Sequence, residues 1–117
     1  MNSNKPYNRV ERVEKQILDI LSNILLKNIS LKELGFITFT QVKMAPDLRS
    51  AKVFYSVLNP MISYEEINVE INKMQKAFKK YMSPQLSLKS TPIIQFYHDE
   101  RFTYAEKIDK LFKEKNL

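Results

Sequence analysis

A strictly alternating run at residues 51–57 constrains the fold of this 117-residue chain more than any other stretch. Four apolar or aromatic side chains occupy every second position: Ala51, Val53, Tyr55 and Val57. Because successive side chains of a β-strand point to opposite faces, this spacing predicts a strand with one buried face. Pro46 has no N–H for a sheet, and Asp47 can bond nearby backbone, so residues 45–50 are predicted to form the loop of a β-hairpin.

Residues 37–44 are rich in β-branched and aromatic residues and are predicted to form the other arm of the hairpin. Its apolar residues change parity between Phe39 and Val42, which a β-bulge near Thr40 or Gln41 would reconcile.

Two helices are predicted from apolar residues spaced three and four apart. The first runs from about residue 8 to residue 27 or 28, after polar residues 1–7 that are expected to be frayed. The second is a single helix over residues 64–82, which begins at a capping box of Ser63 and Glu66 and is ended by a proline at position 84.

A third strand over residues 93–97 follows from renewed alternation, and Pro92 introduces it. Thr103 and Glu106 are expected to cap a last short helix. This order of elements predicts one α+β domain, in which a small three-stranded sheet carries helices on one face. Asp47, Gly35 and Pro92 are expected to have structural roles, with Asp47 holding the hairpin corner.

The composition excludes most classes of active site. No cysteine, one histidine and one glycine leave no disulfide, no cysteine or histidine zinc site and no Gly-rich phosphate loop. His98 and Asp99 could suggest a nuclease, but adjacent strand residues point to opposite faces, so His98 is interpreted as a surface residue at a strand end. We expect no catalytic residue, metal, cofactor or small-molecule substrate.

No apolar run reaches the length of a membrane span, and the N-terminus lacks the apolar core of a signal peptide. We therefore expect a cytoplasmic protein that binds no membrane and is a monomer.

The positive charge is unevenly distributed. The formal net charge of +6 favours a polyanionic partner, and the window between Glu70 and Asp99 contains lysines but no acidic residue. Cations also crowd the start of the first helix, where they oppose the helix dipole. The candidate RNA-binding residues are Lys73, Lys76, Lys79, Lys80, Lys89, Arg9, Arg12, Lys15, Arg49 and Lys52.

Within this set, Lys73, Lys76 and Lys80 are predicted to form one stripe on the second helix, with Lys79 at its flank. The alternative is that this stripe and the cluster of Arg9, Arg12 and Lys15 are merely solvated helix faces.

An ordered set of short motifs gives the chain a resemblance to a known family. The motifs are Arg12-Val13, Leu34-Gly35, Val42-x-Met44-x-x-Asp47-Leu48-x-x-Ala51-Lys52-Val53 and Pro92-x-Ile94-x-Phe96-x-x-Asp99. Over about residues 9–112, in this order and spacing, the chain resembles ribosome-binding factor A of bacteria. The resemblance implies a type II KH-like fold without a GXXG loop. It also implies a non-catalytic factor that binds the small ribosomal subunit and its 16S rRNA in late maturation and supports 16S rRNA processing.

The chain departs from the resembled family at one point. The family has an interrupted helix with an Ala-x-Gly kink, and Met74-Gln75-Lys76 stand at the matching positions, so a straighter helix is an alternative here.

Two other functions remain open. One is a general protein-interaction or structural domain with incidental basic charge, which salt-insensitive partner binding would favour. The other is a small RNA-processing enzyme, for which the residues provide little chemistry.

Overall fold

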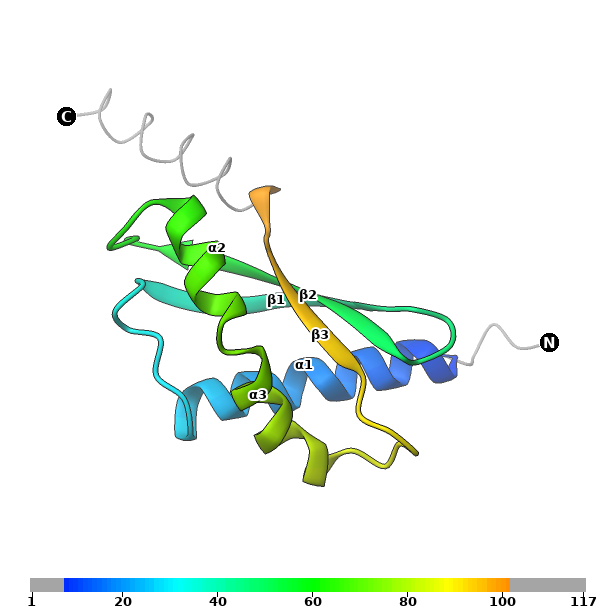
Figure 1. The fold of residues 1–117 in the computed structure, drawn as a ribbon. Coiled ribbons are helices and arrows are strands. Elements are labelled where there is room, and N and C mark those ends of the chain that lie inside the picture. The colour runs from blue at the N-terminus through cyan, green and yellow to red at the C-terminus, as the bar shows by residue number, and fades with distance from the viewer. Residues whose placement is uncertain (1–7, 102–117) are drawn as a thin grey trace.

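The computed structural model describes residues 8–101, which form a three-stranded sheet with helices packed against it (Figure 1). In chain order the elements are α1 Arg9–Lys27, β1 Phe36–Met44, β2 Ser50–Leu58, α2 Tyr64–Asn72, α3 Gln75–Met82, the short 3₁₀ helix η1 Ser83–Gln85 and β3 Ile93–His98. The predicted α+β architecture is confirmed. The frayed segment expected at residues 1–7 and the helix expected at Thr103 lie outside the described residues. None of the described helices is long and apolar enough to cross a bilayer.

The sheet has the order β1-β2-β3, with β1 antiparallel and β3 parallel to β2. Phe39 lies opposite Tyr55, whereas Gln41 lies opposite Phe54, so Thr40 is the extra residue of a β-bulge. The structure thus contains the bulge that the change of parity left as a way to reconcile the two faces. The bulge allows the apolar residues on both sides of Thr40 to face the core although their parity in the sequence differs.

The buried face of β2 is the predicted one, since Ala51, Val53, Tyr55 and Val57 are all at most 4% exposed. Three phenylalanines join the sheet to α3. Phe78 lies 5.6 Å from Phe39 and 5.3 Å from Phe96, measured between ring centroids, with both pairs edge to face. Each such buried side chain contributes roughly 1.5–3 kcal/mol to stability. The described helices therefore all pack on this face of the sheet.

The first helix, α1, has a capped N-terminus and is hydrogen-bonded to the sheet. Asn8 is its N-cap and accepts a hydrogen bond from the backbone N–H of Glu11 at 2.8 Å. Glu14 Oε2 accepts from the backbone N–H of Met44 at 2.7 Å, which fastens α1 to the end of β1. This contact sets the N-terminal half of α1 beside the hairpin corner.

The predicted single helix over residues 64–82 is wrong, as is the straighter alternative. The chain forms two helices, α2 and α3, which meet at Lys73 and Met74. The N–H of Met74 donates to the carbonyl of Ile71, three residues back, whereas the N–H of Phe78 donates four residues back to Met74. The helical turn therefore tightens and then resumes. With φ −92° and ψ 6°, Met74 lies in a region that residues with side chains can adopt, so the break needs no glycine.

The side chain of Asn72, the last residue of α2, binds the backbone of β3. Its Oδ1 accepts from the N–H of Phe96 at 2.9 Å, and its Nδ2 donates to the carbonyl of Phe96 at 3.0 Å. Asn72 also bonds the carbonyl of Asn68 and the amide of Gln75, on either side of the helix break. A strand at the edge of a sheet leaves backbone N–H and C=O groups unpaired. The Asn72 side chain pairs both of these groups of Phe96, as a further strand would.

Replacing Asn72 by leucine is expected to lower the free energy of unfolding by about 1–3 kcal/mol, since both backbone groups of Phe96 lose their partner. Urea denaturation followed by circular dichroism measures this change. Asn23→Leu on the exposed side of α1 is the matched control and should unfold close to the parent. Equal midpoints for the parent and Asn72→Leu would contradict a stabilising role.

Candidate nucleic-acid interface

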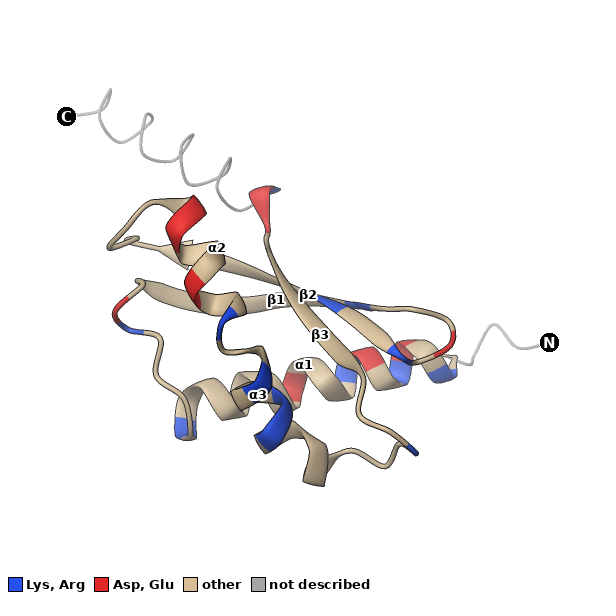
Figure 2. Ribbon diagram, viewed as in Figure 1, with Lys and Arg blue, Asp and Glu red and all other residues tan. Residues whose placement is uncertain are grey.

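The predicted RNA-binding cations lie on three separate parts of the fold (Figure 2). One group surrounds the hairpin corner and the start of α1, a second lies on α3 and at Lys73 just before it, and Lys52 lies on β2. Acidic residues lie along α1 and on α2, where Glu65 and Glu66 in the first turn are favoured by the helix dipole (Figure 2).

Arg9, Arg49 and Lys89 line one groove of about 600 Å³ together with Leu48 and Ser90, although they come from three distant segments. We call the part formed by Arg9, Arg49 and Lys89 the basic groove. Asp47 also lines the groove and supplies one negative charge. Three cations around a concavity can contact successive phosphates of a nucleic-acid backbone, and such contacts position a partner without reading its sequence.

Asp47 lies at the hairpin corner, where it was predicted to bond the backbone. Its Oδ1 accepts a hydrogen bond from the backbone N–H of Arg49 at 3.0 Å. Leu48, between them, has a φ of +62°, and its N–H donates to the carbonyl of Ala45 at 2.9 Å. The Asp47 side chain thus holds a tight turn that points Arg49 into the basic groove.

Asp47→Ala is expected to cost about 1 kcal/mol of stability, by analogy with the loss of a helix cap. Asp47→Asn keeps the accepting oxygen and should melt like the parent, and thermal unfolding of the three proteins measures both effects. If Asp47→Ala melts like the parent but no longer binds its partner, Asp47 is a contact residue and the corner assignment is wrong.

Arg12 and Lys15 continue the positive surface along α1 beyond Arg9. Both are exposed, and within residues 8–101 neither forms an ion pair with a carboxylate. Glu14, a potential partner, is bonded to Met44 instead. This arrangement leaves their charges directed to solvent and to any polyanion that approaches the basic groove.

The predicted stripe of Lys73, Lys76 and Lys80 on one helix is wrong. Lys73 follows the end of α2 and forms an ion pair with Glu70 at 2.7 Å, while Lys76 and Lys80 belong to α3. Lys76 and Lys79 flank a small hollow of about 180 Å³ beside Ile93 and Ile94 at the start of β3.

Without Lys73, the basic part of α3 consists of Lys76, Lys79 and Lys80, and α3 contains no acid. The Lys73 pair is exposed and therefore contributes little to stability.

Lys52 lies apart from both groups, on the face of the sheet opposite the core. Its Nζ stands 5.6 Å from the ring centroid of Tyr97, which in turn lies 5.8 Å from that of Phe54. Of these three residues, only Lys52 was predicted from the sequence to contact RNA. Phe54 and Tyr97 alternate with the buried residues of β2 and β3, so their positions in the sequence could have indicated that both lie on the open face of the sheet.

His98 lies at the end of β3 as expected, and it is half-buried. Its ring stacks on Tyr64 with 4.6 Å between centroids and lies 5.6 Å from Tyr55. Burial raises the pKa of Tyr55 to about 12, so its hydroxyl stays protonated and donates to Asn68 Oδ1 at 2.9 Å. His98 therefore takes part in the packing of this aromatic group.

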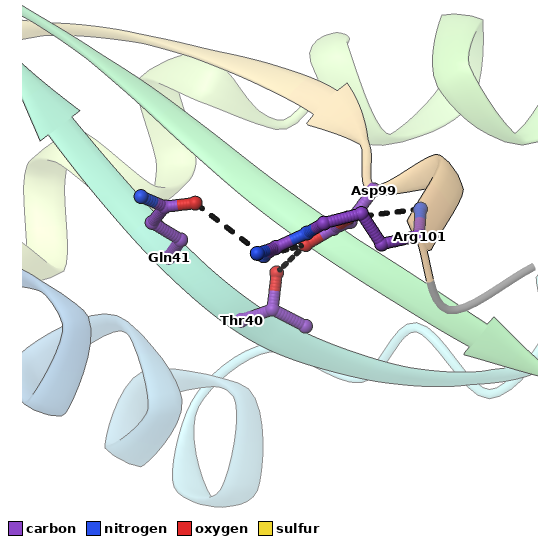
Figure 3. Close-up of polar contacts among 4 residues, drawn as sticks. All are labelled: Thr40, Gln41, Asp99 and Arg101. Atoms are coloured by element: carbon purple, nitrogen blue, oxygen red, sulfur yellow. Dashed lines mark hydrogen bonds and ion pairs between the residues drawn. The ribbon is translucent and has the colours of Figure 1, made fainter. Parts of the chain in front are cut away.

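Asp99 is buried, and its side chain binds the bulge residue Thr40 and Arg101, two residues further along the chain (Figure 3). Its Oδ2 accepts from the hydroxyl of Thr40 at 2.7 Å and from Arg101 Nη2 at 2.8 Å. The Arg101 hydrogen bonds, with a smaller contribution from Thr40, lower the pKa of Asp99 to about 2 in spite of its burial. Arg101 Nη2 also reaches Gln41 Oε1 at 3.4 Å. In residues 8–101 no three carboxylate or imidazole side chains are grouped as a metal site.

Pro92 and Gly35 are the two other residues that were expected to have structural roles. Pro92 is buried immediately before β3. Gly35 has a φ of +134°, and a Cβ there would stand 2.9 Å from Val57 Cγ1 and 3.0 Å from the carbonyl oxygen of Asn59. Glycine is the residue that permits both the conformation and the close approach.

Comparisons with known proteins place this arrangement in one family. The sequence profile described as Ribosome-binding factor A matches residues 9–112. The chain is 31% identical to ribosome-binding factor A of Geobacter metallireducens over 108 residues, which cover 92% of each sequence.

Solved structures agree with that match. The crystal structure of ribosome-binding factor A from Thermus thermophilus superposes with a TM-score of 0.67 at 12% identity, covering 76% of this chain and 93% of that one. A second Thermus thermophilus structure, fitted into the cryo-EM map of a 30S–ribosome-binding factor A complex, gives 0.59 at 13% identity, with 74% and 90% covered. The expected KH-like fold is confirmed.

Proposed function

Since this chain belongs to the ribosome-binding factor A family, we propose that it is an assembly factor that binds the small ribosomal subunit and its 16S rRNA during late maturation. The match over residues 9–112 carries this proposal, because it includes every described element. The Thermus thermophilus protein fitted into a 30S complex supports the choice of partner. In this role the chain acts in the cytoplasm, as a monomer of one domain, and supports 16S rRNA processing without cutting RNA.

The basic groove and the lysines of α3 are the proposed contacts to rRNA phosphates, with Arg12 and Lys15 extending the groove along α1. Arginine and lysine side chains suit this role because they contact phosphate oxygens irrespective of base identity. Lys73 is proposed as a weaker contact, since Glu70 already neutralises it.

A non-catalytic role fits the chemistry of the groups nearest to a candidate active site. The carboxylate of Asp99 is bound by Thr40 and Arg101, and the ring of His98 packs on Tyr64, so neither has the geometry of a general base facing a substrate. The proposed factor shapes or holds the RNA while a separate nuclease cuts it.

Sedimentation tests the proposal. In a lysate of cells that produce the tagged protein, we expect it to migrate with the small subunit and not with mature ribosomes or polysomes. The comigration should weaken strongly between about 50 and 200 mM salt, because phosphate contacts release counterions. Protein that stays at the top of the gradient contradicts subunit binding, and salt-insensitive comigration favours a protein-interaction domain.

A further inference from the structure

The open face of the sheet, opposite the core, carries two partly exposed aromatic rings at its centre. Phe54 of β2 is the register partner of Tyr97 of β3 and of Gln41 of β1, so the three side chains share this face. The rings of Phe54 and Tyr97 lie 5.8 Å apart at 33° to each other, and Tyr97 is 36% exposed. Two adjacent rings on an open sheet face form a platform on which a planar group can stack.

Neighbouring contacts hold the platform in place. The hydroxyl of Tyr97 donates to Gln95 Oε1 at 2.9 Å, and Lys52 Nζ stands 5.6 Å from the centre of the Tyr97 ring. These contacts restrict the ring before any partner arrives, which reduces the entropy that binding would otherwise cost.

The charge around the rings has one sign. Lys43 and Lys52 are opposite each other in the register of β1 and β2. Arg101 also reaches Gln41, the register partner of Phe54, but its charge is paired with that of Asp99 (Figure 3). Among the described residues, none of the strand side chains that point to this face is acidic. The platform therefore suits a partner that combines flat rings with negative charge.

We propose that this face binds a single-stranded segment of RNA, with an unpaired base stacked on Tyr97 and Phe54 and its phosphates near Lys43 and Lys52. The proposal rests on the proposed function in taking RNA as the partner, but it adds a second surface that differs from the basic groove in the kind of RNA it accepts. Duplex RNA does not suit it, because stacked and paired bases do not present their faces to a protein.

The test uses the purified full-length chain and fluorescence anisotropy with a labelled octaribonucleotide of adenines and cytosines, which cannot pair with itself. A second octamer has the same phosphates but abasic sugars, and a third probe is a duplex of equal length. We expect the parent to prefer the base-carrying single strand. Tyr97→Leu should weaken that binding by between about fivefold and one hundredfold and remove the preference over the abasic octamer.

Tyr81→Leu is the matched control, because Tyr81 is 39% exposed and lies on α3 away from the sheet face. It should bind all three probes as the parent does. Phe54→Leu should act like Tyr97→Leu, and Lys52→Gln provides a third variant that leaves both rings in place. Melting curves of each variant confirm that the fold is retained.

Equal affinity of the parent for the base-carrying and abasic octamers would overturn the proposal, as would unchanged binding by Tyr97→Leu. Failure to bind any octamer would also overturn it, whatever the protein does in a lysate gradient. Comigration with the small subunit is a separate readout, so a parent that binds the octamer without comigrating contradicts the proposed function and leaves the stacking surface supported.

Discussion

Gly35→Ala is expected to destabilise the protein by about 2–5 kcal/mol, the largest stability loss we predict for the addition of one methyl group. Two effects add. The φ of +134° strains any residue with a side chain, and the new Cβ would stand within 3.1 Å of Val57, Asn59 and Pro60. At Asn59 and Pro60 the contacts are backbone atoms, so a change of side-chain rotamer cannot relieve them.

The loss should be visible as a fall in the urea midpoint and in the melting temperature. Since a small domain has only about 5–15 kcal/mol of stability, the variant should lose a large fraction of it. Glu33→Ala, at an exposed position in the same loop, is the control and should change stability by no more than about 0.5 kcal/mol. A Gly35→Ala protein that melts with the parent would show that the loop can relax around the methyl group.

Neutralising the basic groove with Arg9→Gln, Arg49→Gln and Lys89→Gln is expected to cause the largest loss of binding. Each phosphate contact that is removed reduces the slope of log K against log salt by about 0.9 for duplex RNA or 0.7 for single strands, taking the DNA values as a guide, so three should flatten it by roughly two to three. The fold should survive, because all three side chains are exposed. Binding of purified protein to purified small subunits at several salt concentrations measures the slope.

A second triple variant, with Lys76, Lys79 and Lys80 changed to glutamine, separates α3 from the groove. Glutamine is nearly as good a helix former as lysine, so α3 should remain intact. Lys27→Gln with Lys32→Gln removes exposed charge near the other end of α1 and is the control. If the groove triple keeps the parent's affinity and salt slope, these cations are a solvated surface, and the α3 triple then decides whether the interface lies there.

Local patterns predicted most of the fold because the relevant forces act within a few residues. The alternation at residues 51–57 predicted a buried strand face, and the parity change between Phe39 and Val42 was consistent with a bulge, which the structure contains. Both depend only on which way successive side chains point. The same holds for the cap at Ser63, whose side chain accepts a hydrogen bond from the N–H of Glu66, three positions on.

The helix break could not be predicted in this way, because long-range contacts accompany it. Asn72 accepts from and donates to the backbone of Phe96, a residue 24 positions away, and the apolar spacing from Ile71 to Phe78 continues across the interruption. The sequence also could not predict which of the candidate RNA-binding residues lie together. Nothing in the sequence around Arg9, Arg49 or Lys89 indicates that the folded chain brings them to one groove.

The two outer strands of the sheet also bear on how the protein behaves at high concentration. An unpaired strand edge can recruit the edge of another molecule and start aggregation. On β3, the Asn72 amide occupies both backbone groups of Phe96, and β1 is interrupted by the bulge at Thr40, whose hydroxyl is bound by Asp99. Each border of the sheet is therefore obstructed near its middle, and a second copy would find no long uninterrupted edge on which to extend the sheet.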